Sequence, residues 1–557
     1  MPDQKSPSQI RTDAPGGGTI EVRGMTSLEK NKFVRVKYDR KSALVSYKRF
    51  GWDKSGARQE LSDKGLDIVS DRDWRAVIDV VADIKSFPRY PIIEHPGWNG
   101  SYYAFTNGKV AGPRGHPRGE AIFKPDKERV AHRGSYELWR DEVASLLVGQ
   151  TIPSFMLMAA LTAPILLLSG RKDNVGFEIS GEGETGKSTC QRLMASTIGS
   201  ANYVRSFYAT HAGLEQEMEA HADAPMIIDE NNLFGAGEAS GIQQERHKGF
   251  AFLMANGMAK RRFNSPETKK NRLVYMTSAN KPFYEVLNGA HRETALAALD
   301  RLIPIRVRAE SKLGIFDALP KGYTSARQLA QHLDAAILEQ HGTAFPRFLK
   351  CLINDRAEDE DGLKRSIRNC VTSFESEIAV AGSRGGGNRV SEAFGLVYAA
   401  GSFAKRHGIL PADMDCLEAV VQCYRNYRAS VPDKLSLAER LNAIVSRPET
   451  RVLRRGKWPT MTDEDVELHG AFVRPGNHGT TELLLTARCR DRFIPDLKAI
   501  RSTDEFIRLH IGEKSHPGKM SRITIKRQIR KNVRSERLTC FTLPKAVSAA
   551  PDEDQPQ

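Results

Sequence analysis

The sequence predicts an α/β fold in which five parallel strands alternate with helices. Alternating apolar residues at 175–179 end abruptly at Gly181, and an amphipathic pattern typical of a helix begins at Lys187. Residues 225–230, PMIIDE, form the short apolar run that is typical of a buried parallel strand. Further strand patterns with helical segments between them indicate a repeated strand–helix series, and they lie at 203–207, 273–280 and 302–307.

Composition restricts the class of protein. The chain has 557 residues, enough for several domains, of which 40% are hydrophobic and 27% are charged. Its net charge of +15 and pI of about 9.4 favour an anionic partner, nucleic acid before membrane. The most apolar stretch, 155–168, is shorter than a membrane span and contains Pro164. We therefore expect a buried helix there and no membrane contact.

The cysteines indicate a compartment. The seven cysteines form no CxxC pair and no cluster with histidine. This usage is typical of reduced thiols in a cytoplasm and argues against structural zinc. The first residues also lack the apolar stretch of a signal peptide. We therefore expect a cytoplasmic protein.

Composition and periodicity change along the chain and divide it into modules. The first residues are polar and Gly-rich, the next region alternates like strands around one helix at 71–84, and helical periodicity dominates after the last predicted parallel strand. The expected boundaries are a disordered arm at 1–18, a β-rich α+β module at 19–133, the strand–helix core at 134–320, a helical lid at 321–446, a basic, winged-helix-like α+β module at 447–545 and an acidic tail at 546–557.

Residues 181–189 read GEGETGKST and contain the full G-x-x-x-x-G-K-[ST] pattern of a P-loop. Glycines are required because backbone N–H groups must surround a phosphate chain at close range. Lys187 would reach the β- and γ-phosphates of ATP, and Ser188 would ligate Mg²⁺ beside the helix N-terminus. The predicted nucleotide-binding residues are Gly181, Glu182, Gly183, Glu184, Thr185, Gly186, Lys187, Ser188 and Thr189.

Acidic and polar residues end the strands that follow. Asp229 would hold Mg²⁺ through water, and Glu230 would polarise the water that attacks the γ-phosphate. Asn280, at the end of the 273–280 strand, would reach the γ-phosphate from the neighbouring strand; the alternative is an ordinary turn residue. ATP and Mg²⁺ are therefore the predicted cofactors, and ATP hydrolysis is the predicted reaction.

A basic ribbon is predicted near the C-terminus. Residues 521–530 and 537–543 alternate like two strands around a basic turn, with Lys526, Arg527 and Arg530 among the cations. Two interpretations are open: a DNA-contacting wing, or a solvated charged hairpin.

With these motifs in place, the order of segments resembles that of AAA+ ATPases. More narrowly, the chain resembles the family called domain of unknown function 927, whose members are carried by phages, plasmids and integrated elements and include cassette-chromosome helicases. The resemblance implies a homo-oligomeric, ring-forming ATPase that acts on single-stranded or forked DNA. It covers roughly residues 45–545, and its supporting segments are 95–105, 135–150, the P-loop, 252–262, 301–319 and 388–401.

The chain departs from the family pattern in three places. The loop 235–244 is Gly-rich where a helical start is expected, and the 273–280 strand ends in TSAN where Ser-Thr-Gly-Glu is usual. No zinc-binding primase module precedes the core, so the resemblance carries no primase activity.

The resemblance also implies roles for individual basic residues. Lys260, Arg261 and Arg262 would lie in a hairpin that projects into the pore of the ring; the alternative is a solvated basic loop. Arg301 would act across the subunit interface on the neighbour's γ-phosphate, with Arg292 as second choice. The alternative for Arg301 is a salt bridge with Asp300 or Glu293, and Arg389 is the candidate for a further phosphate-sensing arginine.

Two functions are consistent with the sequence. The first is an ATP-dependent AAA+ DNA helicase or translocase of a mobile element or phage. The second is a nucleotide-switched DNA-binding or remodelling ATPase that does not unwind. A small-molecule kinase that uses the same P-loop is disfavoured by the strand series and the helical lid.

Overall fold

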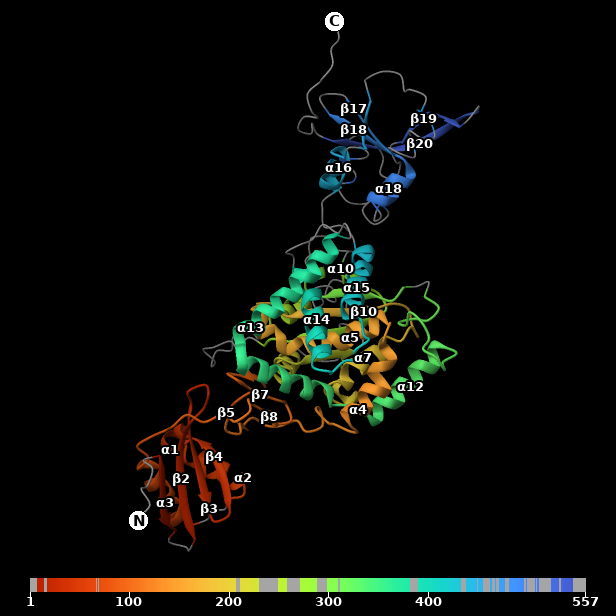
Figure 1. Ribbon diagram of the computed structural model, residues 1–557. Coiled ribbons are helices and arrows are strands. Elements are labelled where there is room, and N and C mark those ends of the chain that lie inside the picture. The colour runs from red at the N-terminus through yellow and green to blue at the C-terminus, as the bar shows by residue number, and fades with distance from the viewer. Residues whose placement is uncertain are drawn as a thin grey trace. The chain divides into compact units, whose positions relative to one another are not determined.

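The computed structural model (Figure 1) divides the chain into two compact units, Met1–Ala429 and Ser430–Gln557, which are described separately. It describes all residues except 1–7, 15–17, 67, 69, 207–210, 230–248, 258–270, 288–297, 309–310, 381–388, 432–436, 448, 454–460, 463–465, 467–469, 476–479, 495–496, 498–505, 507, 510–521, 530–531 and 544–557.

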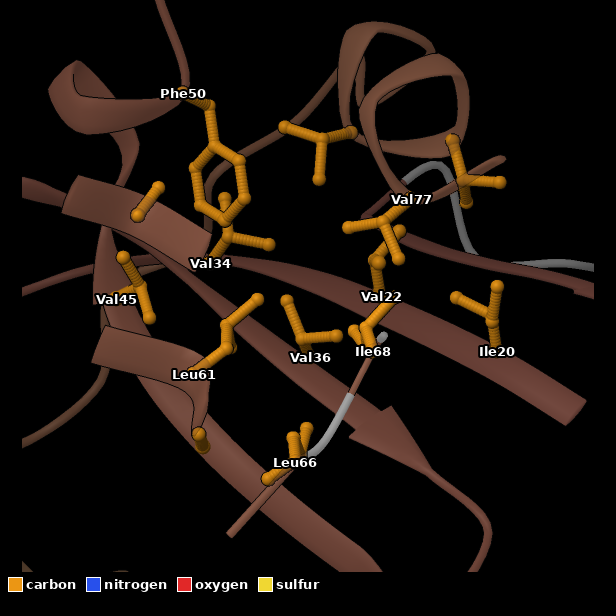
Figure 2. Close-up of a cluster of buried hydrophobic side chains, with 14 of the residues drawn as sticks. Ile20, Val22, Val34, Val36, Val45, Phe50, Leu61, Leu66, Ile68 and Val77 are labelled. Atoms are coloured by element: carbon orange, nitrogen blue, oxygen red, sulfur yellow. The ribbon is translucent and has the colours of Figure 1, made fainter. Parts of the chain in front are cut away.

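The first unit begins with a four-stranded antiparallel sheet in the order β1-β2-β3-β4: β1 (Gln9–Asp13), β2 (Thr19–Thr26), β3 (Lys32–Tyr38) and β4 (Lys41–Ser46). Alternate residues such as Val34 and Val36 point to one face, where helices bury them (Figure 2). The helices are α1 (Tyr47–Trp52), α2 (Lys54–Asp63) and α3 (Asp71–Ala82). The α3 helix, which Ser70 caps by accepting a hydrogen bond from Asp73 N–H, matches the helix expected at 71–84.

Five short strands form two small sheets between this module and the core. β5 (Ile92–Ile93) pairs with β9 (Glu120–Ala121), and β6 (Gly97–Asn99), β7 (Tyr102–Ala104) and β8 (Val110–Ala111) form a three-stranded antiparallel sheet. β6 and β7 lie within the segment 95–105, which the sequence analysis placed in the β-rich module.

The core contains a five-stranded sheet in which every pairing is parallel. The strand order is β11-β12-β13-β10-β14, so β10, the first strand of the series, lies in the interior of the sheet. The predicted mixed α/β fold is confirmed. The strands are β10 (Val175–Ser180), β11 (Arg205–Ser206), β12 (Pro225–Asp229), β13 (Val274–Ala279) and β14 (Ile303–Arg306), and the connecting helices include α7 (Lys187–Ser196), α8 (His211–Ala220) and α10 (Phe283–Leu287).

The apolar stretch before β10 is a core helix. α4 (Tyr136–Trp139) leads through short π and 3-10 turns to α5 (Thr151–Thr162), and α6 (Leu166–Ser169) follows. The helical stretch Thr151–Ser169 is long and apolar enough to cross a membrane, and it is longer than the apolar stretch that the sequence analysis expected. However, 89% of it is buried inside the protein. α5 packs on α7, on β12 and on β13, as a central helix of a folded core does.

Helices dominate the region after β14, as expected. They are α12 (Ala326–Glu339), α13 (Ala344–Val380), α14 (Arg389–Arg406) and α15 (Cys416–Ser430). α13 is kinked at Asp359, whose backbone is not helical, and α14 packs on both α13 and α5. The aromatic ring of Phe394 on α14 contacts Phe155 and Phe177, so these helices share one core with β10.

The second unit is a six-stranded sheet with helices. The sheet order is β15-β17-β18-β20-β19-β16: β15 (Arg451–Val452), β16 (Met461–Thr462), β17 (Ala471–Pro475), β18 (Thr481–Leu485), β19 (Arg522–Ile529) and β20 (Asn532–Leu543). The basic hairpin is present as the antiparallel pair β19–β20, but it belongs to a larger sheet than a winged helix requires, so that part of the prediction is not confirmed. α16 (Leu437–Val445), which the sequence analysis assigned to the lid, packs in this unit's core together with α18 (Ala487–Phe493).

Candidate active site

The P-loop lies between the end of β10 and the start of α7. Glu184 and Gly186 have φ values of 60° and 95°, in the left-handed region. Glycine is required at 186 because the side chain of Ile315 lies where a Cβ atom would be. Gly186 caps α7 without a side-chain hydrogen bond, so the first N–H groups of this helix remain for a ligand.

Lys187 connects the loop to the neighbouring strand. Its Nζ donates to the carbonyl oxygens of Gly181 (2.7 Å) and Glu182 (2.6 Å) and to Asn280 Oδ1 (3.3 Å). Burial lowers the pKa of Lys187, and the nearby Asp229 carboxylate partly opposes this shift. The predicted lysine and the predicted asparagine therefore meet at the carboxyl ends of β10 and β13.

Asp229 ends β12 and is held from β13. Ser278 Oγ donates to Asp229 Oδ1 at 2.8 Å, and Gln191 Nε2 on α7 donates to the carbonyl oxygen of Ile228 at 3.0 Å. A cavity of about 310 Å³ opens beside these groups. It is lined by Ser188, Gln191, Arg192, Ala201, Val204, Arg205 and Asp229.

A segment after β14 closes the other side of the P-loop. Val307 N–H donates to the Ser180 carbonyl at 2.8 Å, and Ile315 N–H donates to the Thr185 carbonyl at 3.0 Å. Gly314 has φ 63°, and a Cβ atom there would overlap the Thr185 carbonyl oxygen. Sequence analysis missed this contact, and the only available signal was a glycine shortly after the last predicted strand.

The opposite edge of the sheet, where the parallel strands begin, is built from buried polar contacts. Asn174, just before β10, donates through Nδ2 to the carbonyls of Met254 (2.8 Å) and Asn271 (3.1 Å) and accepts from Leu273 N–H. Asn271 N–H in turn donates to the carbonyl of Gly257 at 2.8 Å. The two ends of segment 258–270 are thus brought together at this amino edge, away from the P-loop.

Asp223, just before β12, joins the segment 95–105 to the same edge. Its carboxylate accepts from Trp98 N–H (2.9 Å) and from Arg272 Nε (2.8 Å) and Nη2 (3.2 Å). Its carbonyl accepts from the Tyr103 hydroxyl at 3.1 Å. Burial raises the pKa of Asp223, while Arg272 and the Trp98 N–H act in the opposite direction.

A second buried network lies next to Asp223. Arg129 donates to both carboxylate oxygens of Glu217 on α8, at 2.9 and 3.1 Å, and to Asp126 at 3.0 Å. His221 is buried behind this pair, and its Nδ1 lies 2.7 Å from the Glu217 carbonyl, so Nδ1 carries the proton. Burial first, and then the Arg129 charge, lower the pKa of His221 to about 3.

Comparison with known proteins gives a family and a fold. The sequence model of the family described as Domain of unknown function (DUF927) matches residues 30–273, which include the P-loop, Asp229 and both polar networks. Residues 30–273 are therefore similar to the DUF927 family. The family resemblance expected from the sequence is therefore confirmed over this range.

Among solved structures, the SCCmec type IV Cch active helicase is similar to the whole chain. It has a TM-score of 0.54 and 13% identity over 95% of this chain and 96% of that chain, which establishes a shared helicase-like fold. The NrS-1 C-terminal region (TM-score 0.25, 10% identity, 58% and 65% coverage) and the JCV helicase (0.19, 13%, 36% and 53%) are too dissimilar to add to this result. No curated protein sequence matches.

The residues around the P-loop fit a nucleotide with magnesium. The α7 N-terminus and Lys187 supply donors for phosphate, and Ser188 and Asp229 supply the oxygen ligands that Mg²⁺ prefers beside one cavity. Within the described residues, no group of three or more His, Cys, Asp or Glu side chains forms a metal site. A site that uses one carboxylate and one hydroxyl therefore depends on phosphate oxygens and water for its remaining ligands.

Arg301 lies just before β14, beyond the residues that the DUF927 model matches. Its guanidinium packs over the Phe252 ring, 4.2 Å from the centroid, and its carbonyl accepts from the Tyr275 hydroxyl. Arg389 forms an ion pair with Asp173 at 3.4 Å, at the amino edge, so the structure separates it from the P-loop by the length of β10.

Of the remaining predicted residues, two lie on a described strand and the others lie outside the described part of the chain. Lys526 and Arg527 are on β19, where Arg527 pairs with Arg534 of β20 in the backbone register. The predictions that fall on residues outside the described ranges concern Glu230, Lys260, Arg261, Arg262, Arg292, Glu293 and Arg530.

Proposed function

We propose that this protein is an ATP-dependent AAA+ DNA helicase or translocase of a mobile element or phage, that it works as a hexameric ring, and that it acts in the cytoplasm. The observation that supports this proposal best is the convergence of Lys187, Asn280 and Asp229 at the carboxyl edge of the parallel sheet. Ligands of open α/β sheets bind at this edge, where the strand order changes direction.

Each residue at this edge has a proposed role in ATP hydrolysis. Lys187 binds the β- and γ-phosphates, and the hydrogen bonds that its Nζ donates to the Gly181 and Glu182 carbonyls would exchange for phosphate oxygens. Ser188 and Asp229 hold Mg²⁺, with Ser278 orienting the Asp229 carboxylate. Asn280 contacts the γ-phosphate, and Glu230 polarises the attacking water. Magnesium, when bound, neutralises charge that develops on the phosphoryl oxygens.

The proposed DNA contacts involve two basic segments of the chain. Lys260, Arg261 and Arg262 belong to the segment 258–270, whose ends meet at Gly257 and Asn271 on the amino edge. We propose that they contact DNA in the centre of the ring, and that Lys526, Arg527 and Arg530 form a second contact. Replacing the first three by alanine should lower DNA-stimulated ATPase and flatten its salt dependence, with basal ATPase retained.

Ring assembly would place Arg301 at the neighbour's γ-phosphate. In the single chain, the Arg301 guanidinium packs on the Phe252 ring. In the ring it would leave Phe252 and contact the nucleotide bound to the neighbouring subunit. Arg301→Ala and Lys187→Ala would each be inactive, and rings mixed from both should regain ATPase activity, because some interfaces combine an intact P-loop with an intact arginine. Normal ATPase activity in Arg301→Ala alone would refute this role.

The decisive experiment measures ATPase activity and strand displacement on purified protein with and without DNA. Single-stranded DNA should stimulate ATP hydrolysis, and a forked duplex should be unwound only with ATP and with Lys187 intact. ATP hydrolysis that DNA does not change, together with tight duplex binding, would refute the helicase and favour a nucleotide-switched DNA-binding ATPase.

A further inference from the structure

One tryptophan of the N-terminal module is almost completely exposed. Trp52, the last residue of α1, has 94% of its surface accessible. Few large hydrophobic residues in the described part of the chain are exposed, and the others are Leu138, Leu338 and Val452. Trp52 is thus an aromatic residue whose side chain is almost fully in solvent.

Two other aromatic residues of α1 pack against the rest of the module and position the helix. Phe50 is buried and points onto the sheet beside Val34 (Figure 2), and Tyr47 packs edge-on against Phe87 at 4.9 Å between ring centroids. The other face of the helix carries Lys48 and Trp52, which are four residues apart and therefore neighbours on one surface. A Cβ atom at Gly51 would meet nothing within 4 Å, so the space beside the ring is open.

Basic residues outnumber acidic residues in the sequence around the ring, and four of them, Arg35, Lys37, Arg49 and Arg58, are paired with carboxylates. Residues 30–58 contain ten Lys or Arg and two Asp, although the whole chain has 83 basic and 68 acidic residues. Lys48 and Lys54 on either side of Trp52 are both exposed. Neither lysine forms an ion pair with a carboxylate of the described residues, so both charges remain available to an anionic partner.

These features favour one kind of partner. A protein interface or a membrane would require a contiguous apolar patch of several hundred Å², and a single ring among lysines does not supply it. A nucleic-acid strand with unpaired bases needs an aromatic ring on which a base can stack, and cations spaced along its backbone. The bases of a duplex are already stacked on one another, so none is available to stack on the exposed ring. Double-stranded DNA is therefore not the expected partner.

We propose that the exposed face of α1 binds single-stranded nucleic acid, with a base stacked on Trp52 and the flanking phosphates paired with Lys48 and Lys54. This inference rests on the proposed function, since it assumes a protein that acts on DNA. It adds a contact that is independent of the segment 258–270 and of the β19–β20 hairpin, and that lies in a different module from the P-loop.

The test measures the affinity of the full-length protein for a fluorescein-labelled oligothymidylate. An oligonucleotide of about 30 nucleotides is used, because this is longer than the site that one binding module covers. Trp52→Ala should weaken binding about tenfold, because loss of one stacked base has an effect of this order. Trp52→Phe keeps a ring and should stay within about threefold of wild type. Lys48→Ala with Lys54→Ala should lower the salt slope by about 1.4, whereas Trp52→Ala should leave the slope unchanged.

Leu138→Ala is the matched control, since Leu138 is also an exposed hydrophobic residue but has no place in this surface. Wild-type affinity in Trp52→Ala would overturn the inference and leave the proposed function intact. Equal weakening by Trp52→Phe and Trp52→Ala would also overturn it, since a ring would then be insufficient. A wild-type protein that hydrolyses ATP but does not bind the oligonucleotide would instead refute the DNA part of the proposed function. Trp52-dependent binding to anionic phospholipid vesicles, with oligonucleotide affinity unchanged, would identify a membrane surface and refute the strand contact.

Discussion

The two edges of the five-stranded sheet are built from similar residue types but are held very differently. At the carboxyl edge, Lys187 and Asn280 are partly exposed and bond to one another and to loop carbonyls. At the amino edge, Asp223 and Arg129 are buried and joined to partners by two or more hydrogen bonds each. At the carboxyl edge, a ligand can reach the polar groups. At the amino edge, the polar groups bond to one another and hold the chain in place.

This difference separates the proposed ATP hydrolysis from the proposed contact with DNA. Breaking a buried, hydrogen-bonded pair costs several kcal/mol, so the amino edge should behave as a rigid support. The segment 95–105 and the two ends of 258–270 are attached to that support through Asp223 and Asn174. Substitutions at the carboxyl edge should therefore change ATP turnover, whereas substitutions at the amino edge should change stability or the response to DNA.

The largest expected effect is at the P-loop. Lys187→Ala should abolish ATP binding, whereas Glu230→Gln should keep binding and lower hydrolysis by about a thousandfold, because the carboxylate acts only on the attacking water. Fluorescent-nucleotide binding and phosphate release measure the two steps. Lys172→Ala removes an exposed lysine just before β10, at the other edge, and should have no effect. Hydrolysis at the wild-type rate in Glu230→Gln would remove PMIIDE from the active site.

Asn280→Ala should have a smaller effect on the same reaction. The Asn280 side chain accepts a hydrogen bond from Lys187 Nζ at 3.3 Å, and its amide would contact the γ-phosphate. Loss of one such polar contact lowers turnover by about a hundredfold without a large change in nucleotide affinity. Steady-state kinetics distinguish kcat from KM, and an unchanged kcat would reduce Asn280 to a turn residue.

Two glycines give a direct test of the comparison between edges. Gly314 at the carboxyl edge and Gly257 at the amino edge have φ values of 63° and 66°, and in each a Cβ atom would overlap a backbone carbonyl oxygen. Gly314→Ala should displace the P-loop at Thr185 and raise the KM for ATP about tenfold. Gly257→Ala should leave that KM unchanged and reduce the stimulation of ATPase activity by DNA.

Both variants introduce the same strain, so each is the control for the other. Thermal unfolding of both proteins shows whether the loss of stability is comparable. If both glycine variants raise the KM for ATP equally, the two edges are not functionally separate and the comparison fails.

The sequence predicted the carboxyl edge of the sheet much better than the amino edge, for a physical reason. Lys187, Asp229 and Asn280 lie within short motifs whose spacing along the chain is set by strand–helix geometry, so their meeting could be anticipated. Asp223 and Trp98 are 125 positions apart, and nothing in either local sequence indicates that they bond. Periodicity predicts strands and helices, but contacts between distant loops depend on the tertiary fold.

The same limit explains the other differences. The glycine at 314 could be seen, but its position against Thr185 depends on how the chain returns from β14. The helical lid was predicted from periodicity, whereas the assignment of α16 to the second unit depends on which core buries Leu437 and Leu441. A basic hairpin was predicted at the C-terminus, but its membership of a six-stranded sheet involves strands too short to recognise.

The smallest expected effect is a pH dependence of stability at the amino edge. His221 has a pKa of about 3 in the folded protein, because it is buried and lies next to Arg129, whereas an unfolded histidine titrates near 6.5. Below about pH 6.5 the unfolded chain binds a proton that the folded chain does not, so stability falls as the pH decreases. At pH 5 the loss from this residue should be about 2 kcal/mol.

His221→Asn keeps a donor near the position of Nδ1, which lies 2.7 Å from the Glu217 carbonyl, and removes the titration. Urea unfolding at pH 7 and pH 5 gives the change in free energy of unfolding for each protein, and the subtraction cancels carboxylates that titrate in both. Wild type should lose about 2 kcal/mol more than His221→Asn over this range, while His332→Asn, at an exposed histidine, should behave as wild type. Equal losses in wild type and His221→Asn would mean that water reaches this network, and the rigid support proposed for the amino edge would then be incorrect.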